Sequence, residues 1–177
     1  SVTERKRLGL FTTPEVVVDR ILEAVGYTPE EPIEGKTLLD PACGPGAFLV
    51  RAVRVLLARC QRLGYTAEET LNQVQASLFG MDIVPLAIYL ARLNVLAQVI
   101  DLLQQVKRDS PLYRFHGRGL FVADALDMRG PSLFGLLHPS RNGDEAQEIK
   151  HRQGRFVRGL DFVVGNPPYG KASHLGT

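Results

Sequence analysis

The sequence predicts an α/β protein built on a parallel sheet with helices on both faces. Short apolar runs alternate with longer stretches of helical periodicity, a pattern typical of parallel strands joined by helical crossovers. Three of these runs end at an acidic residue and the last ends at an Asn-Pro-Pro turn, as expected where the carboxyl ends of parallel strands form a ligand site. The 177 residues are 45% hydrophobic and 23% charged, the composition of a globular domain with one core.

The first element is expected to be a helix over residues 14–25. Thr13 directly before Pro14 has the pattern of an N-cap followed by a proline at the first helical position. The apolar residues behind it recur at helical spacing, and Gly26 would close the helix. These apolar residues are Val17, Val18, Ile21, Leu22 and Val25.

A glycine-rich turn joins the first predicted strand, Thr37–Leu39, to a predicted helix over Ala47–Leu63. Gly44 and Gly46 can adopt positive φ and bring the backbone close to a ligand, and Asp40 places a carboxylate at the end of the strand. A dinucleotide fingerprint is not completed, because position 49 is leucine rather than the third glycine. No Lys-Ser or Lys-Thr pair follows, which excludes a P-loop.

The remaining elements continue the alternation. Thr66 and Glu69 form a capping box in front of an extra helix. Asp82 follows the second strand, where its carboxylate can accept from two ribose hydroxyls or can cap the next helix. Asp124 follows the third strand, and the favoured interpretation of this aspartate taken alone is a turn residue. The expected elements are the helix Ala67–Ser77, the strand Leu78–Met81, the helix Pro85–Lys107, and the strands Leu120–Val122 and Phe162–Val164.

The last strand ends in Asn166-Pro167-Pro168-Tyr169. Two prolines in succession exclude both helix and ladder hydrogen bonding, so backbone carbonyls stay free to face the cleft. The side-chain oxygen of Asn166 and the carbonyl of Pro167 form two acceptors suited to an exocyclic amino group. Tyr169 adds a flat face on which a base can stack. The alternative interpretation is a turn that simply terminates the strand.

Together these segments resemble the cofactor-binding region of gamma-class N6-adenine DNA methyltransferases, with the motifs in that class's order. The resemblance runs from Gly9 to Gly170 and is strongest to the methyltransferase parts of type I-like and fused type II restriction-modification enzymes. The matching segments are Gly9–Pro14, Asp40–Phe48, Phe79–Ile83, Val122–Leu126 and Asn166–Tyr169.

The resemblance implies a Rossmann-like S-adenosylmethionine-dependent methyltransferase fold whose C-terminal strands are missing. Residues 1–177 would be one truncated domain, with residues 14–26 as the helix after the first cofactor motif. S-adenosylmethionine would be the cofactor and S-adenosylhomocysteine the product. Thr13 would lie by the methionine carboxylate, Asp82 and Ile83 by the ribose and adenine, and Asp124 by the adenine amino group. The implied cofactor-binding residues are Thr13, Asp40, Pro41, Ala42, Cys43, Gly44, Gly46, Phe48, Asp82, Ile83, Asp124 and Ala125, and the implied catalytic residues are Asn166, Pro167, Pro168 and Tyr169.

The same resemblance implies methyl transfer to N6 of an adenine flipped out of DNA, within a restriction-modification or phage-defence system. Double-stranded DNA would bind through a recognition domain absent from this chain, and a specificity or restriction subunit would be a further partner. Similar turns occur in N2-guanine RNA, N4-cytosine DNA and glutamine methyltransferases, so these substrates stay open, as does a non-catalytic cofactor-binding module. The fragment alone is expected to be inactive.

Composition sets further bounds. Two cysteines are too few for a disulfide scaffold and indicate reduced thiols of a cytoplasmic protein. Four histidines without ligand spacing indicate no metal site, and nothing resembles a signal peptide or a membrane span. A net charge of +2 is too small to indicate nucleic-acid binding by itself.

Two groups of basic residues could contact phosphate. Arg51, Arg54, Arg59 and Arg62 recur on one predicted helix, where a solvated outer face is the favoured interpretation. Residues 128–159 are expected to form an exposed basic loop inserted between the third and fourth strands. The nearness of this loop to the catalytic turn would allow DNA contact.

Overall fold

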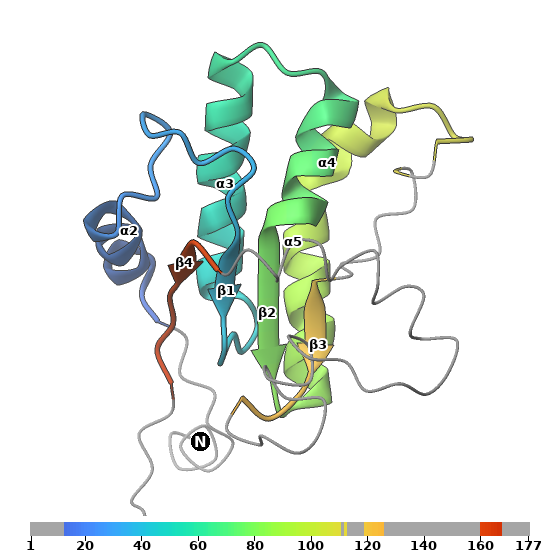
Figure 1. Ribbon diagram of the computed structural model, residues 1–177. Helices are drawn as coiled ribbons and strands as arrows, with labels where there is room; N and C mark the ends of the chain where they lie inside the picture. Colours follow the sequence, from blue (N-terminus) through green and yellow to red (C-terminus); the bar gives the residue numbers. More distant parts are fainter. Residues whose placement is uncertain (1–12, 111, 113–118, 126–159, 168–177) are drawn as a thin grey trace, which may run out of the picture.

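A parallel four-stranded sheet organises the computed structural model, which describes residues 13–110, 112, 119–125 and 160–167 (Figure 1). The strand order is β3-β2-β1-β4, and every neighbouring pair is parallel. The sequence prediction of a parallel α/β sheet is therefore confirmed. The strands are β1 (Leu38–Asp40), β2 (Leu78–Asp82), β3 (Leu120–Val122) and β4 (Phe162–Val163).

The order of the strands creates a switch point at β1. The chain leaves β1 toward β2 on one side, and β4 returns to pair with β1 on the other. Leu39 is paired with Phe79 of β2 and with Val163 of β4. In parallel α/β sheets, ligands bind outside the carboxyl ends of the strands at such a point.

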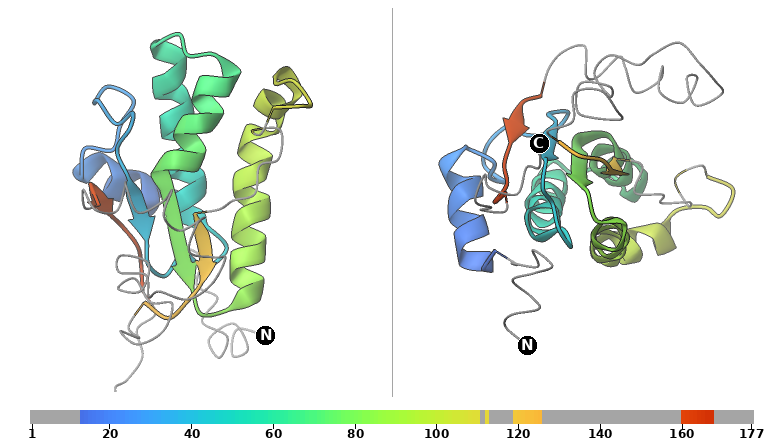
Figure 2. Two further views of the ribbon diagram at one scale, coloured as in Figure 1. Left: turned by 45° about the vertical axis from the view of Figure 1, so that its right-hand side comes forward. Right: turned by 90° about the horizontal axis from the view of Figure 1, so that it is seen from below.

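Four helices accompany the sheet in the described residues (Figure 1). Each contributes buried side chains to one core cluster on one face of the sheet, for example Leu22, Leu56, Leu71 and Ile88. A smaller cluster lies on the opposite face and contains Leu39, Phe79, Met81 and Ala123. Two further views show α3 and α5 running beside the strands (Figure 2). The helices are α2 (Glu15–Ala24), α3 (Ala47–Arg62), α4 (Ala67–Ser77) and α5 (Pro85–Gln105).

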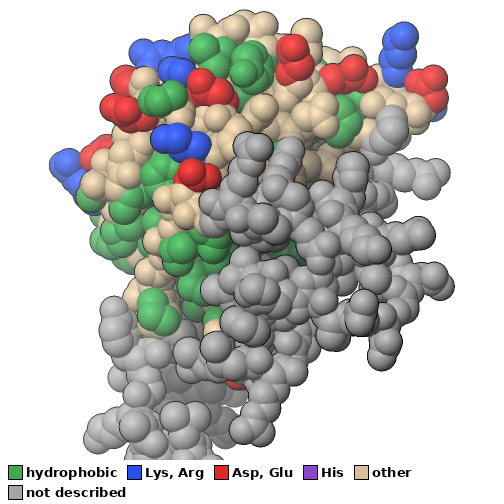
Figure 3. Space-filling view, in the orientation of Figure 1, with side chains coloured by type: hydrophobic (Ala, Val, Ile, Leu, Met, Phe, Trp, Pro, Cys, Tyr) green, Lys and Arg blue, Asp and Glu red, His purple; other side chains and the backbone are tan. Residues whose placement is uncertain are grey.

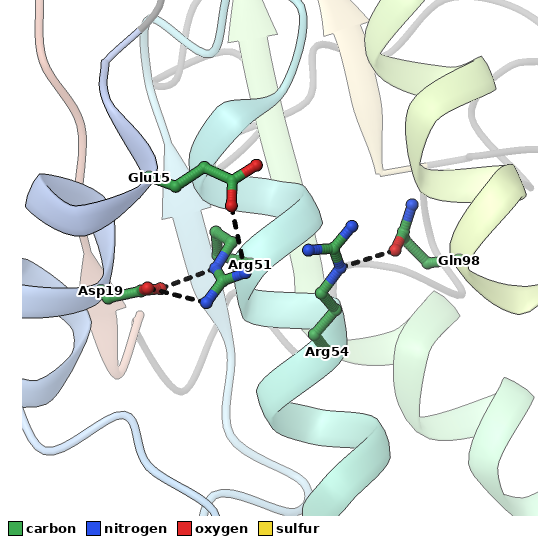
Figure 4. A network of polar contacts seen from close by, with 5 residues as sticks. All are labelled: Glu15, Asp19, Arg51, Arg54 and Gln98. Carbon is green, nitrogen blue, oxygen red and sulfur yellow. Dashed lines mark hydrogen bonds and ion pairs between the residues drawn. The ribbon is translucent and has the colours of Figure 1, made fainter.

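Ion pairs and a hydrogen bond attach α3 to its neighbours. Arg51 donates from Nε and Nη2 to the two carboxylate oxygens of Asp19 on α2, at 2.6 and 2.7 Å, and also contacts Glu15. Arg54 donates to Gln98 on α5 (Figure 4). Because bidentate Arg–carboxylate pairs fix geometry as well as charge, α2 is held against α3 in a defined orientation.

The remaining helix arginines also have partners. Arg59 pairs with Glu34 and Arg62 with Glu30, and positive and negative side chains are intermixed over the described upper part of the face in Figure 3. Arg54 and Arg62 are exposed, as the interpretation of a solvated outer face predicted, whereas Arg51 and Arg59 are half-buried in pairs with Asp19 and Glu34. The 128–159 loop lies outside the described residues.

Helix α5 is long and apolar enough to span a membrane by length and composition, at 21 residues. Four of its buried side chains nevertheless belong to the main core cluster, namely Ile88, Ala91, Val95 and Val99. Arg92 donates to the Leu120 carbonyl at 2.6 Å and Asn94 to the Pro45 carbonyl at 3.0 Å. These contacts are those of a helix packed into the domain.

One local prediction is wrong. The N-cap of α2 is Pro14 rather than Thr13, because Pro14 has extended backbone (φ −56°, ψ 139°) and its carbonyl accepts from Val17 and Val18 at 2.9 and 3.1 Å. The first helical residue is Glu15. The hydroxyl of Thr13 is therefore not a helix cap and bonds elsewhere, to a residue of the candidate site.

Candidate cofactor and catalytic site

Polar side chains gather at the carboxyl edge of the sheet. Asp40 is the last residue of β1 and Asp82 the last of β2. Asp124 follows β3, and Asn166 follows β4. Because all four strands are parallel, this one edge brings together residues spread over more than half of the chain. The predicted residues therefore lie at one edge of the sheet, and their role in binding a ligand stays a prediction.

Backbone hydrogen bonds extend the sheet up to these residues. The Ala123 amide donates to the Asp82 carbonyl at 3.0 Å, and the Val164 amide donates to the Leu39 carbonyl at 2.9 Å. The backbone before Asp124 and Asn166 is thereby tied to the neighbouring strands, which limits how far either residue can move relative to Asp82 and Asp40.

The carboxylate of Asp82 organises the glycine-rich turn. It accepts from the Gly44 amide at 2.9 Å and from the Val84 amide at 2.8 Å. The Cys43 amide donates to the Met81 carbonyl at 2.8 Å, which fastens the turn to β2 a second time. Each carboxylate oxygen keeps a lone pair for another donor. Asp82 therefore holds the turn without losing its capacity to accept from a ligand hydroxyl.

Positive φ values shape the same turn, as its glycines predicted. Gly44 has φ +52° and Gly46 has φ +93°. A Cβ atom on Gly46 would stand 3.1 Å from the Cβ of Ala91 on α5. Gly46 thus combines a left-handed backbone with close packing, and it serves as the N-cap of α3.

Asp40 is the most deeply buried acid of the site, with 1% of its surface exposed. Desolvation by this burial, with a smaller contribution from the charge of Asp82, raises its pKa to about 7. One oxygen accepts from the Ala42 amide at 3.1 Å. The ion pairs of the described residues include none to Asp40. A carboxyl group in this state favours a cationic ligand, which would restore its ordinary ionisation.

Gly165 is a site residue to which sequence analysis assigned no role. A Cβ atom there would stand 2.7 Å from a carboxylate oxygen of Asp40. Only glycine lets the chain after β4 pass this close to Asp40. The signal in the sequence that could have identified Gly165 as a site residue was its position directly before Asn166.

Thr13 and Asn166 meet across the site. Nδ2 of Asn166 donates to Oγ1 of Thr13 at 3.3 Å, across 153 positions of sequence. The resemblance had implied a cofactor contact for Thr13 and a catalytic role for Asn166. The structure brings the two side chains into direct contact.

The other predicted residues divide into surface and interior. Ile83 and its neighbour Val84 are 67% and 40% exposed beside Asp82, where they offer an apolar face. Phe48 and Cys43 are buried in the main core cluster, and burial raises the pKa of the Cys43 thiol. The remaining predicted site residues in the described part of the chain are partly buried or exposed, namely Pro41, Ala42, Asp124, Ala125 and Pro167. Pro168 and Tyr169 lie outside the described residues.

This architecture, with acids and an asparagine on the carboxyl edge of a parallel sheet, is that of a Rossmann-like methyltransferase domain. The chain belongs to the N-6 DNA methylase family, whose model matches residues 1–118.

Curated relatives agree with that assignment. The chain is 44% identical over 166 residues to the type II methyltransferase M.PaeR7I of Pseudomonas aeruginosa, covering 92% of this chain and 23% of the relative. It is 29% identical over 161 residues to the type II methyltransferase M.BstVI of Geobacillus stearothermophilus, covering 91% and 24%. It is 30% identical over 194 residues to the adenine-specific methyltransferase PglX of Streptomyces coelicolor, covering 96% and 15%. The chain thus spans a quarter or less of the length of each.

Solved structures share the fold. The ATP-dependent Type ISP restriction-modification enzyme LlaBIII bound to DNA matches with a TM-score of 0.58 at 19% identity, covering 90% of this chain and 10% of that one. The DrdV–DNA complex matches with a TM-score of 0.56 at 24% identity, covering 94% and 15%.

Proposed function

We propose that this chain is the cofactor-binding and catalytic part of an adenine-specific DNA methyltransferase of the gamma class. In this proposal S-adenosylmethionine is the methyl donor and N6 of a flipped-out adenine is the acceptor. One observation carries the proposal: Asn166, which follows β4, lies at the same carboxyl edge of the sheet as the two acids that end β1 and β2.

The residues present fit S-adenosylmethionine. Asp40 is a buried carboxyl group with a raised pKa, and the ion pairs of the described residues include none to it. S-adenosylmethionine carries a positive charge that could compensate the negative charge of this carboxylate. Asp82 can accept from ribose hydroxyls with its remaining lone pairs. The exposed apolar side chains of Ile83 and Val84 suit the face of an adenine ring. When bound, S-adenosylmethionine supplies an electrophilic methyl group.

The chain's contribution to the chemistry is to prepare the amino group. The N6 lone pair of adenine is delocalised into the ring, which makes the nitrogen a poor nucleophile. The side-chain oxygen of Asn166 and the carbonyl of Pro167 would accept its two N–H bonds, favouring a tetrahedral nitrogen with a localised lone pair. This is preorganised electrostatic catalysis, and no side chain has to remove a proton before attack.

The family supports DNA as the substrate, and one structural neighbour is named as a restriction-modification enzyme, which supports restriction-modification as the setting. One relative is named as adenine-specific and two as type II methyltransferases. Two structural neighbours are described as DNA-bound enzymes or complexes. A DNA-recognition region would lie outside this domain, and any specificity or restriction partner would be a separate subunit.

Product analysis tests the substrate assignment. The full-length protein that carries this domain would be incubated with S-adenosylmethionine and either duplex DNA or RNA, and the digested nucleosides would be separated by mass spectrometry. We expect N6-methyladenine from DNA. N4-methylcytosine, or N2-methylguanine from RNA, would replace the adenine assignment with one of the alternatives, and no methylated nucleoside would favour a non-catalytic module.

A binding measurement tests the cofactor site separately. Calorimetric titration with S-adenosylmethionine should show saturable binding that the Asp82→Ala variant loses, because the variant removes both the ribose acceptor and the bond that holds Gly44. Equal binding by the variant would remove Asp82 from the cofactor site.

A further inference from the structure

The hydroxyl of Thr13 has one observed partner among the hydrogen bonds of the described residues, and that partner is Asn166. Nδ2 of Asn166 donates to Oγ1 at 3.3 Å. The position of Thr13 before α2 would ordinarily explain its hydroxyl as a helix cap. That explanation fails, because Pro14 is the N-cap and its carbonyl receives the first helical bonds.

The consequence lies in the two ends of the Asn166 amide. One end is an acceptor and the other carries two donors. Rotation about the terminal torsion exchanges them, and that torsion has a broad two-fold preference. An amide that presented its NH2 end to the substrate would place donors against the donors of an exocyclic amino group. In the structure the bond to Thr13 engages the NH2 end and leaves Oδ1 for the substrate. A hydroxyl whose own hydrogen is donated to a cofactor carboxylate can only accept from Asn166, so it would hold this orientation.

We propose that Thr13 is a positioning residue for methyl transfer, acting by holding the Asn166 amide with its oxygen toward the target amino group. This proposal rests on the proposed function, since it requires Asn166 to accept from the substrate.

Both ends of this bond stand on anchored elements. Asn166 follows β4, whose continuation is tied to β1 by the Val164 amide at 2.9 Å. Thr13 precedes α2, which is anchored by the buried Leu22 and by the bidentate pair of Asp19 with Arg51 at 2.6 and 2.7 Å. A hydrogen bond between two supported elements fixes a rotamer better than one between two loops.

The Thr13 hydroxyl can serve a second partner as well. It accepts from Asn166 through one lone pair, and its own O–H remains available as a donor. A cofactor carboxylate placed near Thr13, as the family resemblance implies, would accept that hydrogen. Cofactor affinity and amide orientation must therefore be measured separately.

The test compares Thr13→Val with Thr13→Ser in the full-length protein. Valine keeps the branched shape and removes the hydroxyl, whereas serine keeps the hydroxyl. The single-turnover rate of DNA methylation would be measured at saturating S-adenosylmethionine and DNA, alongside the cofactor Kd. We expect the saturated rate to fall about tenfold in the valine variant, as expected for one lost hydrogen bond, and to recover in the serine variant.

Thr66→Val is the matched control, because Thr66 makes a true capping box with Glu69 on α4. Thr66→Val should lower the Tm and leave the saturated rate unchanged. Thr13→Val should lower the saturated rate and leave the Tm unchanged. A valine variant with the wild-type saturated rate, or one impaired only in cofactor Kd, would overturn the positioning role.

Failure of the proposed function would be recognised separately. If the wild-type protein methylates no adenine, crystal structures of the wild type and of Thr13→Val, at a resolution that distinguishes the amide nitrogen from its oxygen, decide whether Thr13 fixes the amide. If the Asn166 amide rotates in the variant, the orienting role of Thr13 is supported. If the amide does not move, that role is excluded.

Discussion

Gly165 and Asp40 are in such close contact that a single added carbon on Gly165 would stand 2.7 Å from a carboxylate oxygen of Asp40. Asp40 ends β1 and Gly165 follows β4, and these two strands pair in parallel. The contact explains why the residue before Asn166 has no side chain, and it makes the path of the chain into Asn166 dependent on Asp40.

Gly165→Ala should therefore disturb both stability and the site. The added methyl group must displace Asp40 or the turn, and such overpacking costs about 1–3 kcal/mol. Urea unfolding would show the lower stability, and calorimetry would show weaker cofactor binding.

A second substitution provides the control for Gly165→Ala. Asp40→Ala in the same background removes the carboxylate that the methyl group meets, so it should recover part of the lost stability. A double variant that simply sums the two single losses would mean that the contact does not limit the turn.

Asp40→Asn should stabilise the protein at high pH. The pKa of Asp40 is raised from 3.8 to about 7, so the folded state keeps a proton that the unfolded state has released. Stability contributed by this group is present at low pH and falls as pH rises through that interval. Asparagine is isosteric and never ionises, so the variant should gain about 2 kcal/mol over the wild type at pH 8.

The comparison between pH 5 and pH 8 checks this sign. Urea unfolding of both proteins should give a difference that grows in favour of Asp40→Asn with increasing pH. A constant difference across that range would show that Asp40 does not titrate there. The same variant should bind S-adenosylmethionine more weakly at pH 8, because it cannot offer a negative charge.

Gly46→Ala should destabilise the protein more than Gly44→Ala, although both residues lie in the glycine-rich turn. Both glycines have positive φ, which costs a residue with a Cβ about 1 kcal/mol. Only at Gly46 does the added Cβ also meet Ala91, at 3.1 Å, since nothing lies within 4 Å at Gly44. Thermal unfolding should therefore show a lower Tm for the Gly46 variant, and equal Tm values would contradict the packing interpretation.

Local signals predicted the elements well. The capping box of Thr66 and Glu69 is present, Gly26 ends α2 with φ +77°, and Pro85 begins α5. Each of these signals depends on a few neighbouring residues, which is why element boundaries agree with the expected ones to within about two residues.

The features that the sequence patterns missed or predicted wrongly depend on tertiary contacts. Thr13 was expected to cap a helix because its sequence neighbours allow it, but its hydroxyl bonds Asn166 at a separation of 153 residues. The closeness of Gly165 to Asp40 likewise depends on the pairing of β4 with β1. The raised pKa of Asp40 comes from burial by the whole fold. Sequence patterns carry no direct signal for such contacts.

The most direct test of the central claim is the Asn166→Ala variant of the full-length protein, measured for cofactor affinity and for methylation of adenine in DNA. Asn72→Ala, an exposed asparagine on α4, is the matched control and should behave as the wild type. Because the proposed role of Asn166 is to accept from the substrate amino group, we expect S-adenosylmethionine to bind with unchanged affinity while methylation falls by at least about 100-fold. Methylation at the wild-type rate by Asn166→Ala would contradict the proposed role of this edge of the sheet.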